Sequence, residues 1–192
     1  MTEKNGVFIT IEGPDGSGKS TQIRLMVEYL NQAGYDVLVT REPGGCPISE
    51  RIRQVILDVN HKEMDPVTEM LLYAASRAQH VAQVIQPALE EGKIVICDRF
   101  LDSSIAYQGY GRQLGEELVL NTNRAALRGI QPDITFFFSM DPGKALHRKE
   151  EERPMDRLEQ EKADFHQRVY EGYRILAERE SGRIRTIDAA QS

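Results

Sequence analysis

The sequence predicts an α/β fold built on a mainly parallel sheet. Short runs of β-branched and aromatic residues alternate with longer amphipathic segments, no segment repeats, and 192 residues are enough for one domain with its own core. Apolar residues make up 40% and charged residues 28% of the chain, which is typical of a globular protein and not of a disordered one. We therefore treat residues 1–192 as a single domain.

The chain is expected to begin with a strand and a glycine-ended helix. Val7–Ile11 is a β-branched and aromatic run that Gly13 ends. Apolar residues then recur at i, i+3, i+4 and i+7 from Ile23 to Leu30, the pattern of one helix face, and Gly34 stands where that helix should stop. Four further strands are expected at Val37–Val39, Ile94–Cys97, Ile134–Phe138 and Ile184–Ile187.

Amphipathic helices are expected between these strands. Apolar spacing indicates helices over 48–56, 118–127 and 165–176. The longest helix begins near Pro66, and Pro87 is expected to kink or end it. The residues that its periodicity turns toward the core are Met70, Leu71, Ala74, Ala78, Val81, Ala82 and Ile85.

Charge and hydropathy exclude several classes of protein. Thirty acidic against 24 basic residues give a net charge of −6, which argues against nonspecific nucleic-acid binding through a basic surface. The longest apolar run, Ile134 to Met140, is too short to cross a membrane, and the first residues lack the pattern of a secretory signal. Cys46 and Cys97 form no CxxC pair, which favours a reduced cytoplasmic protein without a zinc site.

The strongest motif runs from Gly13 to Ser20 and has the form GxxxxGK[ST]. A strand precedes it and an amphipathic helix follows, which is the arrangement in which backbone N–H groups and a helix N-terminus hold phosphates. Lys19 is expected to reach the outer phosphates, and the Ser20 hydroxyl to bind Mg²⁺. An ordinary glycine turn would explain the letters but not this context. The motif therefore predicts a nucleotide-binding loop.

A second signal is the pair Asp98-Arg99, which follows the buried run Ile94–Cys97. A carboxylate at that place can order Mg²⁺ or its waters beside the phosphate loop, and the arginine can hold a second anion. The alternative is a local surface ion pair. The position beside a buried strand and a phosphate loop favours the functional interpretation.

Three further side chains are candidates for contacts with a second ligand. Arg41 follows a predicted strand and precedes Glu-Pro-Gly-Gly, where glycines allow the backbone to approach a ligand closely. Arg77 lies one helical turn after Tyr73, so that a ring and a guanidinium share one face and could stack on and hydrogen-bond a flat base. Taken alone, this pair is better explained as a packed aromatic ring under an extended arginine.

The segment from Lys144 to Lys162 holds six basic and six acidic residues. For most of these charges a solvated helix face laced with i,i+4 pairs is the simpler interpretation. The functional alternative is a mobile lid whose arginines close over phosphates, because phosphoryl transfer requires neutralised charge and excluded water. The histidines form no ligand spacing or triad: they are His61, His80, His147 and His166.

Together these residues resemble the thymidylate kinase (dTMP kinase) family along nearly the whole chain. The first motif is specific alone, and the ordered set is highly specific. The motifs that agree are Glu12-Gly-Pro-Asp-Gly-Ser-Gly-Lys-Ser-Thr-Gln22, Thr40-Arg-Glu-Pro-Gly-Gly45, Leu71-Leu-Tyr-Ala-Ala-Ser-Arg77, Asp98-Arg99-Phe100, Ser103-Ser-Ile-Ala-Tyr-Gln-Gly109, Asp156-Arg-Leu-Glu159 and Ile187-Asp-Ala-Ala-Gln-Ser192.

The resemblance implies a P-loop kinase fold, with a five-stranded parallel sheet in the order 2-3-1-4-5 flanked by helices and a short lid over about 144–160. It implies the reaction ATP + dTMP → ADP + dTDP with Mg²⁺, on the pathway to dTTP, usually in a homodimer. The implied partners are ATP, dTMP and a second copy of the chain, without nucleic acid or membrane. The family often has phenylalanine where this chain has Tyr73, and it continues past the last motif into a final helix.

Carried over position by position, the resemblance implies a set of site residues. Those implied in the transfer itself are Asp15, Lys19, Arg99 and Arg153. The implied ATP contacts are Gly13, Pro14, Asp15, Gly16, Ser17, Gly18, Lys19, Ser20, Thr21, Arg148, Arg157, Ala189 and Gln191. The implied dTMP contacts are Asp15, Arg41, Tyr73, Arg77, Arg99, Ser103, Ser104, Tyr107 and Gln108. The implied metal contacts are Ser20, Asp98 and Glu159.

Within this set the resemblance implies particular roles. Arg41 and Arg99 would hold the acceptor phosphate, and Tyr73 would stack on thymine. The residues implied at the base edge are Arg77, Ser104 and Gln108, with Tyr107 under the deoxyribose. The four variable P-loop positions carry no base, so the lid should supply the transition-state arginine, as in bacterial-type members. The candidates are Arg148, Arg153 and Arg157, with Arg153 preferred.

Two rival functions remain to be weighed. Another nucleotide or deoxynucleoside kinase could use the same scaffold, but two separate arginines at Arg41 and Arg99 match a phosphorylated acceptor better than a bare hydroxyl. A nucleotide-dependent switch protein would need the guanine-reading segment Asn-Lys-x-Asp, and no asparagine in this chain is followed by lysine. A dTMP kinase is therefore the preferred prediction.

Overall fold

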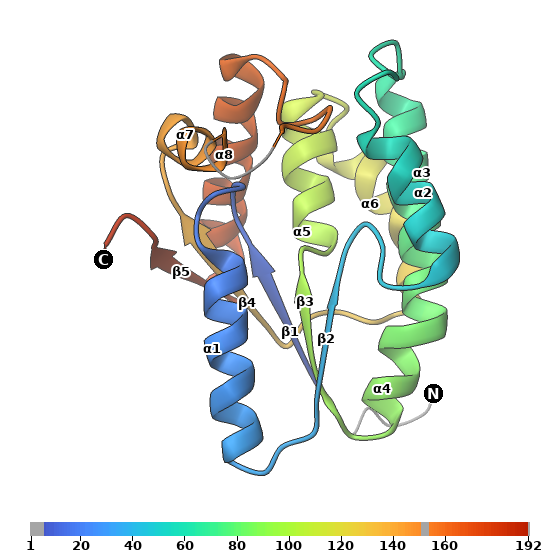
Figure 1. The fold of residues 1–192 in the computed structure, drawn as a ribbon. Helices are drawn as coiled ribbons and strands as arrows, with labels where there is room; N and C mark the ends of the chain where they lie inside the picture. The colour runs from blue at the N-terminus through green and yellow to red at the C-terminus, as the bar shows by residue number, and fades with distance from the viewer. Residues whose placement is uncertain (1–5, 151–153, 192) are drawn as a thin grey trace.

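A computed structural model describes residues 6–150 and 154–191 of the chain. Its centre is a parallel sheet of five strands, β1 (Val7–Glu12), β2 (Val37–Arg41), β3 (Ile94–Asp98), β4 (Ile134–Ser139) and β5 (Ile184–Asp188). The strands lie in the order β2-β3-β1-β4-β5 (Figure 1). The predicted α/β class, the five strands and their order are confirmed.

The register of the sheet brings three functional segments to one edge. Arg41 of β2 and Ile11 of β1 both pair with Asp98 of β3, so the three residues form a row across the carboxyl ends of the strands. In open α/β sheets ligands bind at this edge, where the loops that follow the strands come together. Segments that are far apart in the sequence therefore meet here.

Helices cover both faces of the sheet. They are α1 (Lys19–Gln32), α2 (Pro47–Leu57), α3 (Pro66–His80), α4 (Gln86–Glu90), α5 (Leu101–Ser104), α6 (Glu116–Leu127), α7 (Pro142–Glu150) and α8 (Ala163–Arg179), with π-helical turns η1 (Val81–Ile85) and η2 (Ile105–Gly111). Because side chains alternate along a strand, Ile11 and Ile96 face α1 while Phe8 and Val95 face α3, η1 and α4. A third cluster around Phe137 packs against η2, α6 and α8.

The long helix predicted from Pro66 runs through a π turn. α3 is followed by η1, where the N–H of Gln86 bonds to the carbonyl of Val81 five residues earlier, and the chain continues as α4 to Glu90. Pro87 has no N–H to give, and it occupies the first turn of α4, where that N–H would have no partner within the new segment. The proline is therefore accommodated by the widened turn instead of ending the helix.

Part of the predicted inward face of this helix is wrong. Met70, Ala74, Val81 and Ile85 are buried as expected. Leu71, Ala78 and Ala82 are exposed instead, and 53% of the Leu71 surface is accessible. The apolar stripe is wider than the face that packs on the core, and its outer edge carries apolar side chains that no described part of the chain covers.

The segment 101–111, for which the sequence indicated no regular structure, is helical. α5 and η2 follow directly on β3, although serines and glycines are poor helix formers. The glycines permit close packing on α8: a Cβ at Gly111 would lie 2.8 Å from Phe165 and Val169, and one at Gly172 would lie 2.8 Å from Tyr110. Tertiary packing therefore outweighs local propensity here.

No helix in the described part of the chain is both long enough and apolar enough to cross a membrane.

Candidate active site

The P-loop (Gly13–Ser20) leaves the buried strand β1 and leads into α1, as the sequence predicted. Gly18 precedes the helix with φ 86°, a left-handed backbone conformation that residues other than glycine rarely adopt. The helix then begins at Lys19, and the first N–H groups of such a helix are directed at a ligand above them. The loop is thus shaped to receive an anion.

Lys19 is folded over the P-loop. Its Nζ donates to the carbonyls of Gly13 at 3.0 Å and Pro14 at 2.8 Å, and only 5% of the residue is exposed. Burial, with the neighbouring charge of Arg99, lowers the pKa of Lys19 to about 8, although Asp15 and Asp98 oppose the shift. The ammonium therefore remains mostly charged at neutral pH, in a place where a phosphate could replace the carbonyls.

Two of the three predicted metal contacts lie together. Ser20 and Asp98 line one hollow beside α1, and the buried Oδ1 of Asp98 has no hydrogen-bond partner. Glu159 lies elsewhere, beside Asp15 and Pro14, where it accepts the N–H of Asp156 at 2.8 Å. Among the described residues no group of three or more His, Cys, Asp and Glu could hold an ion alone. A hydroxyl and a carboxylate beside a phosphate loop fit Mg²⁺, which takes its other ligands from water and phosphates.

A central pocket opens next to the P-loop, at the carboxyl edge of the sheet. The predicted acceptor residues that line it are Asp15, Arg41, Tyr73, Arg77, Arg99, Ser103, Tyr107 and Gln108. Ser104 is behind them, buried beneath Arg77. The other lining residues are Glu42, Pro43, Arg53, Leu57, Asp98, Phe100, Asp156 and Leu158.

Arg99 connects the pocket to the P-loop. Its Nη2 lies 3.1 Å from Asp15 Oδ2, and its Nη1 donates to Ser103 Oγ and Tyr173 Oη at 3.2 and 3.1 Å. Its backbone has φ 70°, an unusual value for a residue with a side chain and of a kind that concentrates at functional sites. Burial alone would lower the pKa of Arg99, but Asp15 and nearby groups raise it well above its usual value, so the guanidinium stays charged.

Glu12 supports this arrangement from below, and nothing in the sequence except its place in the motif indicated this role. The buried carboxylate accepts the N–H of Phe100 at 2.7 Å, Ser103 Oγ at 2.5 Å and Tyr173 Oη at 3.0 Å. Burial, and then the charge of Asp102, raise the pKa of Glu12 to about 7. Ser103 and Tyr173, which also contact Arg99, are thus fixed by Glu12.

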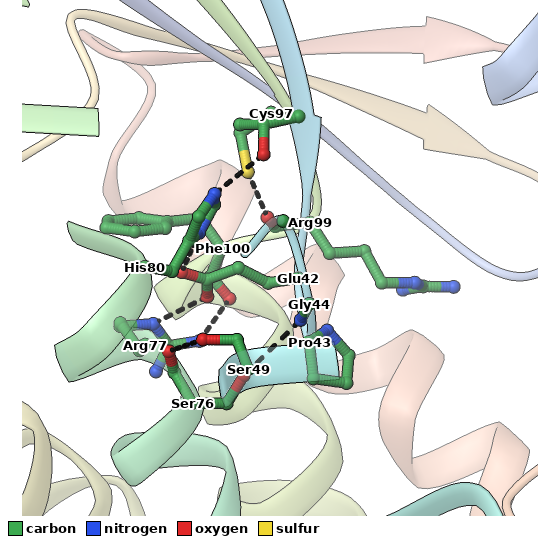
Figure 2. Close-up of polar contacts among 12 residues, drawn as sticks. Glu42, Pro43, Gly44, Ser49, Ser76, Arg77, His80, Cys97, Arg99 and Phe100 are labelled. Carbon is green, nitrogen blue, oxygen red and sulfur yellow. Dashed lines mark hydrogen bonds and ion pairs between the residues drawn. The ribbon is translucent and has the colours of Figure 1, made fainter. Parts of the chain in front are cut away.

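Arg77 is held among polar groups at the back of the pocket (Figure 2). Its Nε donates to Glu42 Oε2 at 2.8 Å, Nη1 donates to Asn123, and Nη2 donates to the Phe100 carbonyl and to Ser104 Oγ, both at 3.0 Å. Only 1% of Arg77 is exposed. Four of the five N–H groups of a guanidinium are therefore engaged, which leaves one Nη1 hydrogen for a ligand.

The loop after β2 is fixed on the same network. Glu42 contacts His80 Nδ1 at 3.1 Å as well as Arg77 (Figure 2). The other ring nitrogen, His80 Nε2, lies 2.6 Å from Thr40 Oγ1. A Cβ at Gly45, where φ is 85°, would collide with His80 and Thr40. Gly45, one of the two glycines that the sequence analysis singled out, is therefore required by close packing of this loop on α3.

Two arginines stand at the open side of the pocket. Arg41 is half exposed and donates to both carboxylate oxygens of Glu50 at 3.0 Å. Arg53, which sequence reasoning missed, donates to the carbonyl of Pro43 at 2.8 Å; burial and Arg41 lower its pKa. On a helix of mixed polarity, nothing in its spacing distinguished Arg53 from an ordinary surface arginine. Arg53 lies close enough to Arg41 for the two charges to interact, and both line the central pocket.

Two tyrosines form the other walls. Tyr73 of α3 and Tyr107 of η2 both line the pocket, and the guanidinium of Arg99 lies 5.2 Å from the centroid of the Tyr107 ring. Burial raises the pKa of both hydroxyls, so they stay protonated. The pocket is thus lined by two neutral aromatic rings as well as by arginines.

The lid residues are divided between two places. Arg148 of α7 is exposed, with Nη1 3.8 Å from Met140 Sδ. Arg157, expected to face ATP, is buried instead against α2 and α3: Nε donates to the Ile56 carbonyl at 2.8 Å and Nη2 to Glu69 Oε2 at 2.7 Å. Arg153 lies outside the described residues. Asp156 and Leu158 of this segment line the central pocket, which the sequence did not indicate.

The last motif follows β5. The N–H of Ala189 bonds to the Ser139 carbonyl at 2.9 Å, and Ala189 packs against the core cluster beneath α1. Gln191 is exposed and its Nε2 donates to Asp188 Oδ2 at 2.9 Å. Ala189 therefore packs on the same core cluster as α1, the helix that follows the P-loop, whereas Gln191 points to solvent.

A phosphate loop after β1, a carboxylate after β3 and an arginine-lined pocket beside them define a P-loop kinase of the kind that phosphorylates nucleoside monophosphates. Comparison with known proteins gives the family. The thymidylate kinase family profile matches residues 11–192. The chain belongs to the thymidylate kinase family.

Individual relatives agree over almost the whole chain. The thymidylate kinase of Finegoldia magna is 56% identical over 186 residues, which is 97% of this chain and 91% of that protein. That of an Exiguobacterium species is 54% identical over 188 residues, 98% of this chain and 89% of that protein. The crystal structure of thymidylate kinase from Ehrlichia chaffeensis superposes with a TM-score of 0.79 at 36% identity, covering 95% of this chain and 92% of that one.

Proposed function

We propose that this chain transfers the γ-phosphate of ATP to dTMP, its family's reaction, with ATP on the P-loop and dTMP in the central pocket. The observation that supports placing dTMP in the central pocket is the set of residues that line it. Eight predicted acceptor residues, drawn from the P-loop, β2, α3 and the segment after β3, line one cavity that Asp15 joins to the P-loop. Among the lining residues, Arg41, Arg53 and Arg99 suit a phosphate, and the rings of Tyr73 and Tyr107 suit a flat base.

The transfer itself requires little covalent chemistry from the protein. Lys19 and the N–H groups of the P-loop would hold the donor phosphates, and Arg99, placed by Asp15, would hold the acceptor phosphate near them. Charge that spreads over the transferred group is then met by fixed cations instead of reorganising water. The acceptor is already an anion, so no strong base is needed.

A divalent cation is the proposed cofactor. Ser20 and the unpartnered Oδ1 of Asp98 would hold Mg²⁺ or its waters. When bound, the ion supplies neutralisation of the phosphate charge. Glu159 would reach the ion only through water, because it lines a different hollow, with Pro14 and Asp15, from the one that Ser20 and Asp98 line.

We also propose a homodimer in a reducing, cytoplasmic setting. The neighbouring helices α2, α3 and α6 expose apolar side chains that a second copy would cover, among them Val55, Val67, Leu71 and Leu118, each more than a third exposed. Cys46 and Cys97 are both buried free thiols, and burial raises the pKa of Cys97 well above its usual value. Unreactive thiols of this kind suit a reducing compartment.

The function is tested by measuring ADP release from ATP and Mg²⁺ with dTMP, with thymidine and with neither. Of these three conditions, we expect ADP release only in the one that contains dTMP. Thymidine lacks the phosphate that the arginines of the pocket require. Chelation of the metal should stop ADP release. ADP release that is independent of dTMP, or equally fast with thymidine, would contradict the proposal.

A further inference from the structure

Behind the wall of the central pocket lies a fully buried carboxylate that the mechanism does not use. Glu69 of α3 has no exposed surface. Its Oε1 accepts Gln108 Nε2 at 2.9 Å and Arg112 Nε at 3.2 Å, and its Oε2 accepts Arg112 Nη2 at 2.9 Å and Arg157 Nη2 at 2.7 Å. All four partners are donors, so every lone-pair direction of the carboxylate is taken.

Glu69 is ionised in this surrounding. Burial alone would raise the pKa of Glu69, but the contacts of Arg112, Gln108 and Arg157 outweigh it and hold the pKa below its usual value. An ionised carboxylate accepts hydrogen bonds and donates none. Gln108 can therefore face Glu69 only with its NH₂ group, since the opposite orientation would set its carbonyl oxygen against a carboxylate oxygen.

The consequence for Gln108 is a fixed amide. Gln108 lines the central pocket and is only 1% exposed, and its Oε1 is buried without any hydrogen-bond partner. A buried acceptor without a partner is costly unless a ligand supplies a donor. Because the amide nitrogen of Gln108 is held on Glu69, the amide oxygen is the atom that remains to accept a hydrogen bond from a ligand.

We propose that Glu69 is a positioning residue for base selection: it locks the Gln108 amide so that an acceptor, and not a donor, is offered to the edge of the bound base. The inference rests on the proposed placement of dTMP in the central pocket and deepens it. A pyrimidine with a ring N–H next to a carbonyl presents a donor beside an acceptor, and Gln108 Oε1 together with the free Arg77 hydrogen complements that pair.

Cytosine presents the reverse pattern, an unprotonated ring nitrogen beside an amino group. A locked Gln108 oxygen would meet a second acceptor there, whereas an amide free to rotate could donate to it. Glu69 therefore contributes to rejection of dCMP without touching the substrate. Arg112 and Arg157 hold the carboxylate in place, and Arg112 is itself tied to Glu161 at 2.7 Å, so the lock includes the segment that follows the lid arginines.

The test is the specificity ratio, kcat/KM for dTMP divided by kcat/KM for dCMP, in Glu69→Gln. A glutamine at position 69 can donate or accept, so the Gln108 amide is no longer locked. We expect the ratio to fall at least about tenfold, an effect of the size that an unpaired buried polar group produces. The ratio of dTMP to dUMP should stay unchanged, because those two bases share the same polar edge.

Two further variants make the result specific. Arg112→Lys disturbs the same buried cluster but keeps a cation beside the carboxylate, which stays ionised and facing Gln108, so its dTMP/dCMP ratio should stay within about threefold of wild type. Gln108→Met removes the amide and should lower the ratio as Glu69→Gln does. If Gln108→Met lowers the ratio and Glu69→Gln does not, the positioning role is overturned while the placement of the base stands. If neither variant changes it, the base contact of the proposed function fails and the positioning role fails with it.

Should Glu69→Gln not fold, wild-type enzyme with bound dTMP gives a second readout by NMR. The side-chain NH₂ signals of Gln108, assigned by their loss in Gln108→Met, should show contacts to Arg112 and not to the thymine ring. A nuclear Overhauser contact from that NH₂ to the base would place the nitrogen in the pocket and overturn the proposal.

Discussion

Asp15 Oδ2 lies 3.1 Å from Arg99 Nη2, so the loop after β1 and the loop after β3 are joined by an ion pair between donor and acceptor sides. The pair is mostly shielded from solvent, and Arg99 is further held by Ser103 and Tyr173, which Glu12 fixes from below. Asp15 of the P-loop and Glu12 at the end of β1 therefore together set the position of the arginine proposed for the acceptor phosphate.

Loss of the P-loop lysine should abolish turnover and spare the fold. Lys19→Ala removes a cation that meets charge growing in the transition state, so kcat should fall at least ~10²-fold. Lys19→Met is the matched control, because it keeps the buried stem and removes only the ammonium. Both should melt near the wild-type temperature. Near-normal turnover in either folded variant would show that the loop is not the donor site.

The activity should decline in alkaline solution. The pKa of Lys19 is about 8 in the nucleotide-free chain, and the lysine is charged below that pH, so kcat/KM for ATP should fall as pH rises through about 8. Phosphate groups titrate near pH ~6 and affect only the acidic side of the profile.

Asp15→Asn supplies the check on this assignment. The charge of Asp15 raises the pKa of Lys19, so its removal should move the alkaline limb to lower pH. Lys19→Arg should lose the limb, since arginine stays charged throughout. A wild-type profile that is flat from pH ~7 to ~9.5 would contradict a titrating Lys19.

The lid arginines should divide into two classes. Alanine at Arg148, Arg153 and Arg157 together should lower kcat by more than about tenfold, because a transition-state arginine is worth about 10³–10⁵ in related phosphoryl-transfer enzymes. Arg157→Met alone should raise KM for dTMP more than KM for ATP, since its guanidinium lies on Glu69 behind the acceptor pocket. A nearly normal kcat in the triple variant would show that the lid arginines do not stabilise the transition state. A rise in KM for ATP alone in Arg157→Met would show that Arg157 acts at the ATP site.

The exposed edge of α3 gives a prediction about assembly. A charge at Leu71, which is 53% exposed, should convert a dimer to a monomer, because it would be buried unpaired in the proposed interface. Leu25→Glu on α1, at a position 44% exposed, is the control and should stay dimeric. Sedimentation velocity of wild type, Leu71→Glu and Leu25→Glu distinguishes them; an unchanged mass for Leu71→Glu would exclude this face.

Some features of the fold and of the site could be predicted because they produce a local pattern in the sequence. The strands and the P-loop leave local patterns, and the row formed by Ile11, Arg41 and Asp98 follows once the strand order is known. The motif set also named most of the residues that line the central pocket. These features depend on spacing along the chain and on the rules of parallel sheets.

Other features depend on which way a long side chain turns. Arg53 and Arg157 look alike in sequence, each a base among polar neighbours, yet one lines the pocket and the other binds a buried carboxylate. Leu71 fits the apolar periodicity of α3 and is nevertheless exposed to solvent. The periodicity shows where the apolar face of a helix lies but not how wide a part of that face the rest of the protein covers. Long-range partners such as Glu69 cannot be read from spacing at all.

The central claim is that Arg77 and its neighbours read the edge of a thymine. Arg77 has one N–H left for a ligand and no acceptor, so it can satisfy a carbonyl at C4 but faces the amino group of cytosine donor to donor. Arg77→Gln should narrow the preference for dTMP over dCMP, because an amide can accept as well as donate. Its folding must be checked, since Glu42 would lose a buried charged partner.

The most direct measurement is kcat/KM of the wild-type chain for dTMP, dUMP, dCMP, AMP and GMP under one set of conditions. We predict dTMP first, dUMP about 10–200-fold lower for want of a methyl group, and dCMP lower still. Purines should be poorest, because we expect the Tyr73 platform to exclude the larger bases by size. Equal use of dCMP and dTMP would contradict the account.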